Sequence, residues 1–390
     1  MKVSLFSAPK ILPLAAVGLA AMIVAGCERP PPESEQRGYR GVGMVAYVNP
    51  RILAAQHRAN VPPAVQPPAV PVPIAAGTVY KNLQVLGDVP LTEFTRLMLA
   101  LTEWVVPKDQ WVAGQGCVYC HDLADMAADT KYQKVVSRSM ITMTQRANAA
   151  WGDHVAPTGV TCYTCHRGNA IPKYVWTTNP GRAASGQGAS GQNRLSAVPA
   201  FASLPYDPMT TFFDKDTTIA ITPATALSPG WNDTINTKKT EWTYALMMYM
   251  SRSLGVGCNH CHNSRQFADW SQSQLTRTKA WYAIRMVREI NHAFVMPLSD
   301  ILPATRKGPL GDPMRVGCET CHQGINKPLF GEPMLKDYPV LGQPSPAVVP
   351  TPDVVPEPAV VPAAVQTDAE VLNAPGGKVT GEAAVQEGLM

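Results

Sequence analysis

A pair of cysteines followed directly by histidine, in the pattern Cys-x-x-Cys-His, occurs four times in this chain. Two thiols and an adjacent imidazole at this spacing are typical of covalent haem attachment, in which the cysteines bond the haem vinyl groups and the histidine binds the iron. The copies lie at 117–121, 162–166, 258–262 and 318–322. We therefore expect four haem c groups, attached at Cys117, Cys120, Cys162, Cys165, Cys258, Cys261, Cys318 and Cys321, with His121, His166, His262 and His322 as iron ligands.

Zinc knuckles and disulfides are the alternative uses of such cysteine pairs. Zinc is disfavoured because every pair is followed at once by histidine. Disulfides are disfavoured because disulfide-rich scaffolds do not space their cysteines so uniformly. The motifs use eight of the nine cysteines, which leaves Cys27.

The N-terminus predicts an export signal over residues 1–26. Lys2 and Lys10 precede a short apolar run at 11–24, which is brief for a membrane-spanning helix. The sequence VAGC at 24–27 resembles the bacterial lipoprotein box, so Cys27 is expected to become an acylated N-terminus. The alternative is an uncleaved helical anchor with an unused Cys27 thiol. Both interpretations place the body outside the cytoplasm, where c-type haems are attached.

Charge and composition limit the class of partner. The formal net charge of +4 includes Lys2 and Lys10, whose removal with the signal leaves +2. Two ionised propionates on each of four haems would bring the net charge near −6, which disfavours a nucleic-acid partner. Four haems would also supply much of the buried apolar matter in a chain with 37 prolines and 29 glycines.

Composition also divides the chain. After the signal, a proline-rich spacer is expected over 27–78, where proline density favours extended chain and prevents regular helix. A Gly/Ser-rich insertion at 181–200 separates two halves, 79–180 and 201–341. The Pro/Ala/Val-rich tail, 342–390, carries six acids against one lysine over 351–390 and is predicted to be disordered.

The two halves repeat each other. TEFT at 92–95 matches TEWT at 240–243, and HRGN at 166–169 resembles HQGI at 322–325. Each half contains a helical pattern, a haem motif, a second helical pattern and a second haem motif. The expected fold is mainly α, a duplicated pair of two-haem units with long irregular loops and weak strand patterns.

Four helices are expected, at 92–105, 134–150, 241–254 and 275–295, each with one apolar face that can lie on a haem. The faces hold Phe94, Met98, Leu101 and Val105; Val136, Met140, Met143 and Ala147; Thr243, Met247, Met250 and Leu254; and Ala283, Val287, Ile290 and Phe294.

The residue pattern alone does not decide which side chain is the sixth ligand of each iron. A methionine on a helix face is more often core than ligand, but Met98 and Met247 each lie one helix upstream of a motif. Met140 and Met143 share a face and cannot be separated. Four histidines lie outside the ligand positions of the motifs. His57 falls in the spacer and His260 lies inside the third motif. His292 lies on an expected helix, where a packing or surface role is at least as good an explanation as iron ligation, and His154 stands alone in a loop.

Longer stretches of the chain resemble the tetrahaem cytochrome c subunit of the photosynthetic reaction centre of purple bacteria. The resemblance covers roughly residues 78–340 and CERPPP at 27–32, through RLMLALTEW (96–104), GVTCYTCHRG (159–168), LGVGC (254–258), IRMVR (284–288) and CHQGINKPLF (321–330). It implies Met98, Met140 and Met247 as sixth ligands of the first three haems, and His154 paired with His322 at the fourth. The stretch between Trp104 and Cys117 is longer than in the family pattern, with extra residues around 109–114.

The resemblance also implies a function, a location and partners. The subunit would lie on the periplasmic face of the photosynthetic membrane, anchored by lipid and bound to the L and M subunits of the reaction centre. It would re-reduce the photo-oxidised special pair with electrons from a soluble cytochrome c or high-potential iron–sulfur protein. The implied spatial order of haems is third, fourth, second, first, with the third nearest the special pair.

Rival functions differ in their iron chemistry. Ligands on both sides of each iron leave no site for a substrate, so we expect an electron-transfer protein and not an enzyme. A respiratory tetrahaem conduit is the alternative with the same chemistry. A multihaem reductase is the alternative from a different class, because it needs an open iron.

Overall fold

The structure, a computed structural model, describes residues 34–37, 45–112, 116–178, 204–205, 207–221 and 236–344. The predicted signal peptide, Cys27, the insertion at 181–200 and nearly all of the tail lie outside the described residues.

Helices joined by irregular loops make up the described chain, with one small antiparallel sheet in which Ser34 pairs with Val48. The strands are β1 (Ser34–Arg37) and β2 (Val45–Val48). The α-helices are α2 (Pro50–Ala59), α3 (Ala76–Val79), α4 (Leu91–Val105), α5 (Tyr132–Ala150), α6 (Gly152–Val155), α7 (Cys162–His166), α8 (Thr237–Leu254), α9 (Leu275–Glu289) and α10 (Cys318–His322). The described residues also include two π-helical segments, Thr210–Asp214 and Ile290–Val295. They include 3₁₀ turns at Lys108–Gln110, Cys117–Tyr119, Cys258–His260, Met296–Leu298, Ala304–Arg306, Pro328–Gly331, Met334–Asp337 and Pro339–Gly342.

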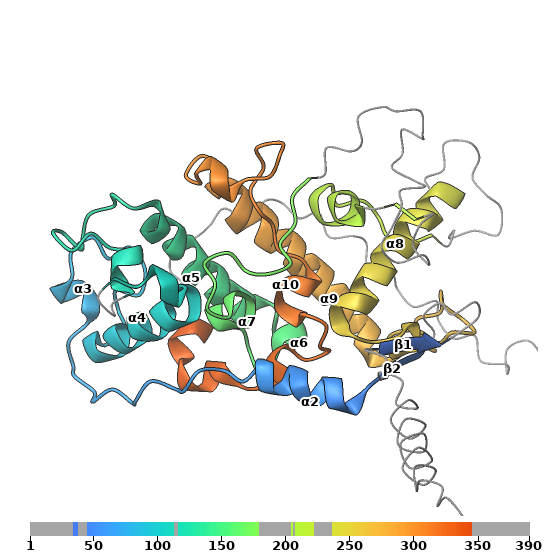
Figure 1. Cartoon of the computed structure of the whole chain (residues 1–390), viewed down its shortest axis with the longest axis horizontal. Helices are drawn as coiled ribbons and strands as arrows, with labels where there is room; N and C mark the ends of the chain where they lie inside the picture. Colours follow the sequence, from blue (N-terminus) through green and yellow to red (C-terminus); the bar gives the residue numbers. More distant parts are fainter. Residues whose placement is uncertain are drawn as a thin grey trace, which may run out of the picture.

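The elements form an elongated body (Figure 1). Helices α3 and α4 lie toward one end, and α8 lies toward the other with the β1–β2 sheet. The short motif helices α7 and α10 lie between them and contact each other. None of the helices in the described ranges combines the length and the apolar composition needed to cross a membrane.

The four predicted long helices are confirmed. The expectations at 92–105, 134–150 and 241–254 correspond to α4, α5 and α8. The fourth, 275–295, is α9 continued by the π-helical turn Ile290–Val295. Pro297 lies two residues after this turn, within the 3₁₀ turn Met296–Leu298, and its missing N–H and fixed φ favour the end of the helical run there.

Local signals at both ends of α8 explain its length. The side chain of Asn236 accepts a hydrogen bond from Lys239 N at 2.9 Å and caps the first turn. Gly255 ends the helix in the left-handed conformation, at φ 65°. The third haem motif begins three residues later, so the end of α8 sets where that motif starts.

The expectation that proline prevents regular helix throughout the spacer is wrong. Helix α2 occupies the stretch between the two proline clusters, and its proline, Pro50, stands in the first turn, where no intrahelical N–H is needed. Asn49 caps it by accepting from Arg51 N at 2.9 Å. The proline-rich segment that follows α2 has no regular secondary structure and runs along α4, where Arg96 Nε donates to Gln66 O at 3.1 Å and to Pro67 O at 3.0 Å.

The end of the second half contributes to the core of the first. Tyr338 packs edge-on against Trp104 of α4, with ring centroids 4.7 Å apart. Gln145 Nε2 donates to Val340 O at 3.1 Å, and Leu329, Met334 and Leu341 are buried in the same cluster as Leu97 and Ile141. Residues 328–342 therefore fold back over α4 and α5.

Buried polar contacts also join the halves. Glu289 of α9, whose side chain is 7% exposed, accepts from Arg146 Nε and from Trp151 Nε1 at 2.6 Å each. Trp176 and Arg315 exchange both backbone hydrogen bonds, at 3.0 and 2.8 Å. The guanidinium of Arg315 lies over the Trp176 ring and pairs with Asp214 and Asp312.

Candidate haem sites

The four motifs adopt two local conformations. The first and third begin as 3₁₀ turns, Cys117–Tyr119 and Cys258–His260. The second and fourth are the α-helical turns α7 and α10, in which the backbone N–H before the first cysteine donates to the threonine hydroxyl within the motif. Both helices end in a residue with positive φ, Arg167 at 46° and Gln323 at 50°, followed by glycine.

Every motif histidine is oriented by the same kind of hydrogen bond. In each case ring Nδ1 lies within hydrogen-bond distance of a backbone carbonyl a few residues downstream, so Nδ1–H donates and Nε2 is left to bind a metal. The pairs are His121 with Met126 O (3.1 Å), His166 with Asn169 O (2.8 Å), His262 with Phe267 O (3.0 Å) and His322 with Ile325 O (3.0 Å).

The electrostatic surroundings favour neutral imidazole, the form that binds metal. Burial lowers the pKa of His166, His262 and His322 below the ordinary histidine value. The charge of Arg277 lowers the pKa of His262 further.

None of the eight motif cysteines forms a disulfide, and two of them, Cys162 and Cys318, are buried. Burial raises the pKa of Cys162 and of Cys318 to about 12, and that of Cys120 to about 11. The second cysteines of the second and fourth motifs meet where α7 packs on α10, with Cys165 Sγ 2.8 Å from Cys321 Sγ. The second and fourth sites are therefore neighbours.

A cavity of about 740 Å³ lies between α4 and α5 and includes the first two motifs. Its volume falls within the range of about 300–1,000 Å³ common for cofactor sites. The apolar face predicted for α4 lines it in full, through Phe94, Met98, Leu101 and Val105. From α5, both Met140 and Met143 line the cavity. The two methionines that helical periodicity could not distinguish as ligands therefore face the same cavity.

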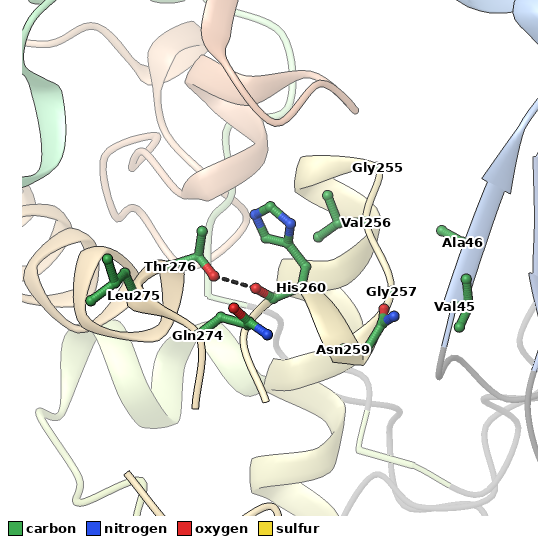
Figure 2. Close-up of a pocket in the computed structure, with 10 residues that line it drawn as sticks. All are labelled: Val45, Ala46, Gly255, Val256, Gly257, Asn259, His260, Gln274, Leu275 and Thr276. Carbon is green, nitrogen blue, oxygen red and sulfur yellow. Dashed lines mark hydrogen bonds between the residues drawn. The ribbon is translucent and has the colours of Figure 1, made fainter. Parts of the chain in front are cut away.

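At the third motif an open pocket of about 560 Å³ is lined by β2, the residues that follow α8 and the start of α9 (Figure 2). His260 points into this pocket, and its backbone oxygen accepts a hydrogen bond from Thr276 Oγ1. Met247 packs half-buried on α8 against the cluster around Leu246, whereas Met248 is buried at 6% exposure.

His154 lies beside His322. The ring centroids are 6.0 Å apart and the planes are inclined by 54°. Burial lowers the pKa of His154 to about 4, and the neighbouring His322 acts in the same direction. His154 Nδ1 is buried without a hydrogen-bond partner. Met286, the position that the repeat would equate with Met140, is instead packed with Ala147 and Val155.

The other histidines have different neighbours. His57 of α2 packs edge-on against Phe330, with ring centroids 4.7 Å apart. His292 Nε2 lies 2.9 Å from Asp214 O and faces the Asp216 carboxylate. These contacts give both residues a packing or surface role.

The residues present fit haem c. Two imidazoles bound to one metal through bonds of about 2 Å would place their ring centroids about 6 Å apart, as found for His154 and His322. Unpaired thiols are the groups that add to haem vinyls, and neutral imidazoles and methionines on apolar walls are the donors of a low-spin haem iron. Sequence reasoning missed the carbonyls that orient the histidines and the buried cation at Lys134, because neither carries a residue-type signal.

Known proteins resemble the chain over most of its length. The family model described as "Photosynthetic reaction centre cytochrome C subunit" matches residues 28–342. The photosynthetic reaction center cytochrome c subunit of Thermochromatium tepidum is 52% identical over 328 residues, 84% of this chain and 79% of that protein. The subunit of Rubrivivax gelatinosus is 47% identical over 343 residues, 87% of this chain and 91% of that protein. The subunit of Roseobacter denitrificans is 39% identical over 277 residues, 68% of this chain and 73% of that protein. The chain therefore belongs to the family of photosynthetic reaction centre cytochrome c subunits.

Proposed function

We propose that this electron-transfer subunit attaches four haem c groups and re-reduces the photo-oxidised special pair of the reaction centre. When bound, the haems supply one-electron chemistry between Fe(II) and Fe(III). The observation that carries the proposal is the common orientation of the motif histidines, each with Nδ1 at 2.8–3.1 Å from a backbone carbonyl. An imidazole held in this way presents Nε2 in one direction and one tautomer.

We propose Met98, Met140, Met247 and His154 as the sixth ligands of the first to fourth haems. Met98 lines the cavity that includes the first two motifs, and so do Met140 and Met143; the family resemblance favours Met140 of the latter two. Support for His154 comes from its unpartnered, buried Nδ1 and its distance from His322. With both axial positions taken by the chain, no iron is left open to a substrate, which favours electron transfer over enzymatic chemistry.

A duplicated two-haem unit explains the alternation of motif conformations. The first and third motifs share a 3₁₀ turn and a histidine acceptor five residues downstream. The second and fourth share a helical turn, a left-handed cap and an acceptor three residues downstream. We assign 79–180 and 201–341 as the two units on this basis.

The spatial order third, fourth, second, first is the proposed path for electrons. The contact between Cys165 and Cys321 favours adjacent second and fourth sites in the middle of the row. The α4 end of the body, with the first motif, and the α8 end, with the third, lie apart (Figure 1). The third site would then face the L and M subunits, and the first would receive electrons from a soluble cytochrome c or high-potential iron–sulfur protein.

Acylation at Cys27 is the proposed attachment to the periplasmic face of the membrane. Two or more acyl chains anchor a protein stably, whereas one alone binds only marginally. Docking on the reaction centre would add to this anchoring.

An anaerobic redox titration of the purified protein, followed in the visible haem bands, tests the haem count and the ligand classes. Three higher-potential waves and one lower-potential wave are expected from three Met–His haems and one bis-His haem. A light-minus-dark absorbance change in the same bands of membranes tests special-pair re-reduction. A respiratory conduit would show the waves without the light response, and a reductase would show high-spin haem that binds an added ligand.

A further inference from the structure

A buried lysine closes the loop that follows the first haem motif. The side chain of Lys134, in the first turn of α5, is 10% exposed. Its Nζ donates to three successive carbonyls, Met126 O at 3.0 Å, Ala127 O at 2.6 Å and Ala128 O at 2.9 Å. These bonds use all three N–H donors of the ammonium, which also lies 3.2 Å from Asp129 Oδ1.

One of these carbonyls is shared with the first motif. Met126 O is also the acceptor for His121 Nδ1, at 3.1 Å. A single oxygen atom therefore joins the histidine of the first haem site to a buried positive charge. Lys134, Met126 and His121 all line the cavity between α4 and α5.

The shared oxygen weakens the hydrogen bond that the imidazole can make. A carbonyl that accepts from an ammonium has less electron density left for a second donor, so the imidazole keeps more of its own proton and donates less charge to a metal. The nearby positive charge itself disfavours an additional positive charge on the iron. Both effects favour Fe(II) over Fe(III).

We propose that Lys134 is a positioning residue that raises the redox potential of the haem attached at Cys117 and Cys120, acting through Met126 O on His121. The inference rests on the proposed role of His121 as iron ligand. Through Lys134, the redox potential of the first haem would differ from that of another haem with the same two ligand types.

The third motif shows the contrast. Arg277, likewise in the first turn of its helix α9, donates to Asp269 O at 3.0 Å and to Ala268 O at 3.4 Å. His262 Nδ1 uses a different oxygen, Phe267 O, at 3.0 Å. A cation thus closes the loop in both halves, but at the third motif these bonds end on carbonyls other than the histidine acceptor.

The test is the potential of the first haem in the Lys134→Gln holoprotein. We expect the Fe(III)/Fe(II) equilibrium of that haem to move at least about threefold toward Fe(III), or about 30 mV lower at about 59 mV per tenfold change. The other three potentials should not move. Cys117→Ala, which leaves one haem vinyl unreacted and shifts the absorbance band of that haem, identifies its wave in both backgrounds.

Arg138→Gln is the matched control. Arg138 lies one turn along α5, has a similarly buried side chain at 13% exposure and binds the same Asp129 carboxylate, at 2.8 Å. Its bonds end on Asp129 and on Asn82 O, and none reaches Met126 O. It should lower the first potential by clearly less than Lys134→Gln does, because it removes a nearby charge but no bond to Met126 O, whereas Lys134→Arg, which keeps the charge, should retain most of the wild-type value.

Asp129→Asn gives a prediction of opposite sign. Removing this carboxylate leaves the ammonium less compensated, so the first potential should rise. An unchanged first potential in Lys134→Gln, with four haems present, overturns the inference and leaves the proposed function intact, even if the variant is less heat-stable. A missing wave at the first site in the wild-type protein would instead overturn the proposed ligation by His121.

Discussion

His154 and His322 lie with their ring centroids 6.0 Å apart, although they belong to opposite halves of the chain. His154 lies on the short helix α6, which packs against α9. His322 ends the motif helix α10. A shared metal would fasten the two halves together at this point.

Replacing His154 tests that pair directly. His154→Met should raise the potential of the fourth haem alone, because a thioether favours Fe(II) relative to imidazole. The change should be on the order of 100 mV within the roughly 0.8 V that axial ligands span. His154→Ala should let the fourth haem bind carbon monoxide, which visible difference spectra detect. If Met286→Leu changed the fourth haem and the His154 variants did not, Met286, the repeat equivalent of Met140, would be its sixth ligand.

Met247→His tests the ligand of the third haem. Imidazole in place of thioether should lower one potential, again on the order of 100 mV within the roughly 0.8 V range of axial ligation. Flash-induced re-reduction of the special pair should then become slower if the third haem is its direct donor. Met248→His is the matched control on the adjacent, buried position of α8. An unchanged titration for Met247→His would make Met247 a core residue and leave Met248 or Met250 as ligand.

Glu289 should be a major source of stability between the halves. Glu289→Ala would leave the indole N–H of Trp151 without its acceptor, while the guanidinium of Arg146, whose side chain is 45% exposed, would remain solvated, at a cost of about 1–3 kcal/mol for the buried donor left unpaired. Glu103→Ala is the control, since its ion-pair partner Lys108 is 65% exposed and 3.7 Å away and its other contact is a long hydrogen bond from Gln66 Nε2 at 3.3 Å; we expect less than about 1 kcal/mol there. Thermal unfolding of the holoproteins measures both, and equal losses would contradict the burial argument.

Gly255 should not tolerate alanine. Its φ of 65° already strains any other residue, and an added Cβ would lie 2.2 Å from the backbone oxygen of Gly324. Gly311, at φ 80° with open space around it, provides the control. Gly311→Ala should cost roughly 1–2 kcal/mol of backbone strain, and Gly255→Ala roughly 1–3 kcal/mol more for the contact. Equal melting temperatures for the two variants would show that α8 can shift away from the fourth motif.

Cys27→Ser tests the lipid anchor. The variant should be released from membranes with its haems attached, or remain unprocessed at the signal, because no acyl chain can be added. Mass spectrometry of the native N-terminus is the direct measurement, and an intact Met1 would contradict acylation at Cys27.

Local sequence patterns predicted the long helices well. Apolar residues at helical spacing define α4, α5, α8 and α9, since one face of each must be buried wherever the helix packs. The helix α2 was missed because the average proline density of the spacer concealed a short stretch in which the sole proline, Pro50, stands at the permitted first turn.

The sequence by itself determined which cysteines and histidines form the four motifs, because that chemistry depends on spacing along a few residues. Only the tertiary structure decided that residues 328–342 complete the core of the first half and that Cys165 meets Cys321. It also decided that His121 shares Met126 O with Lys134. These contacts depend on backbone carbonyls, which every residue carries, and on segments that are distant in the sequence. Neither residue type nor the periodicity of apolar residues therefore predicts them.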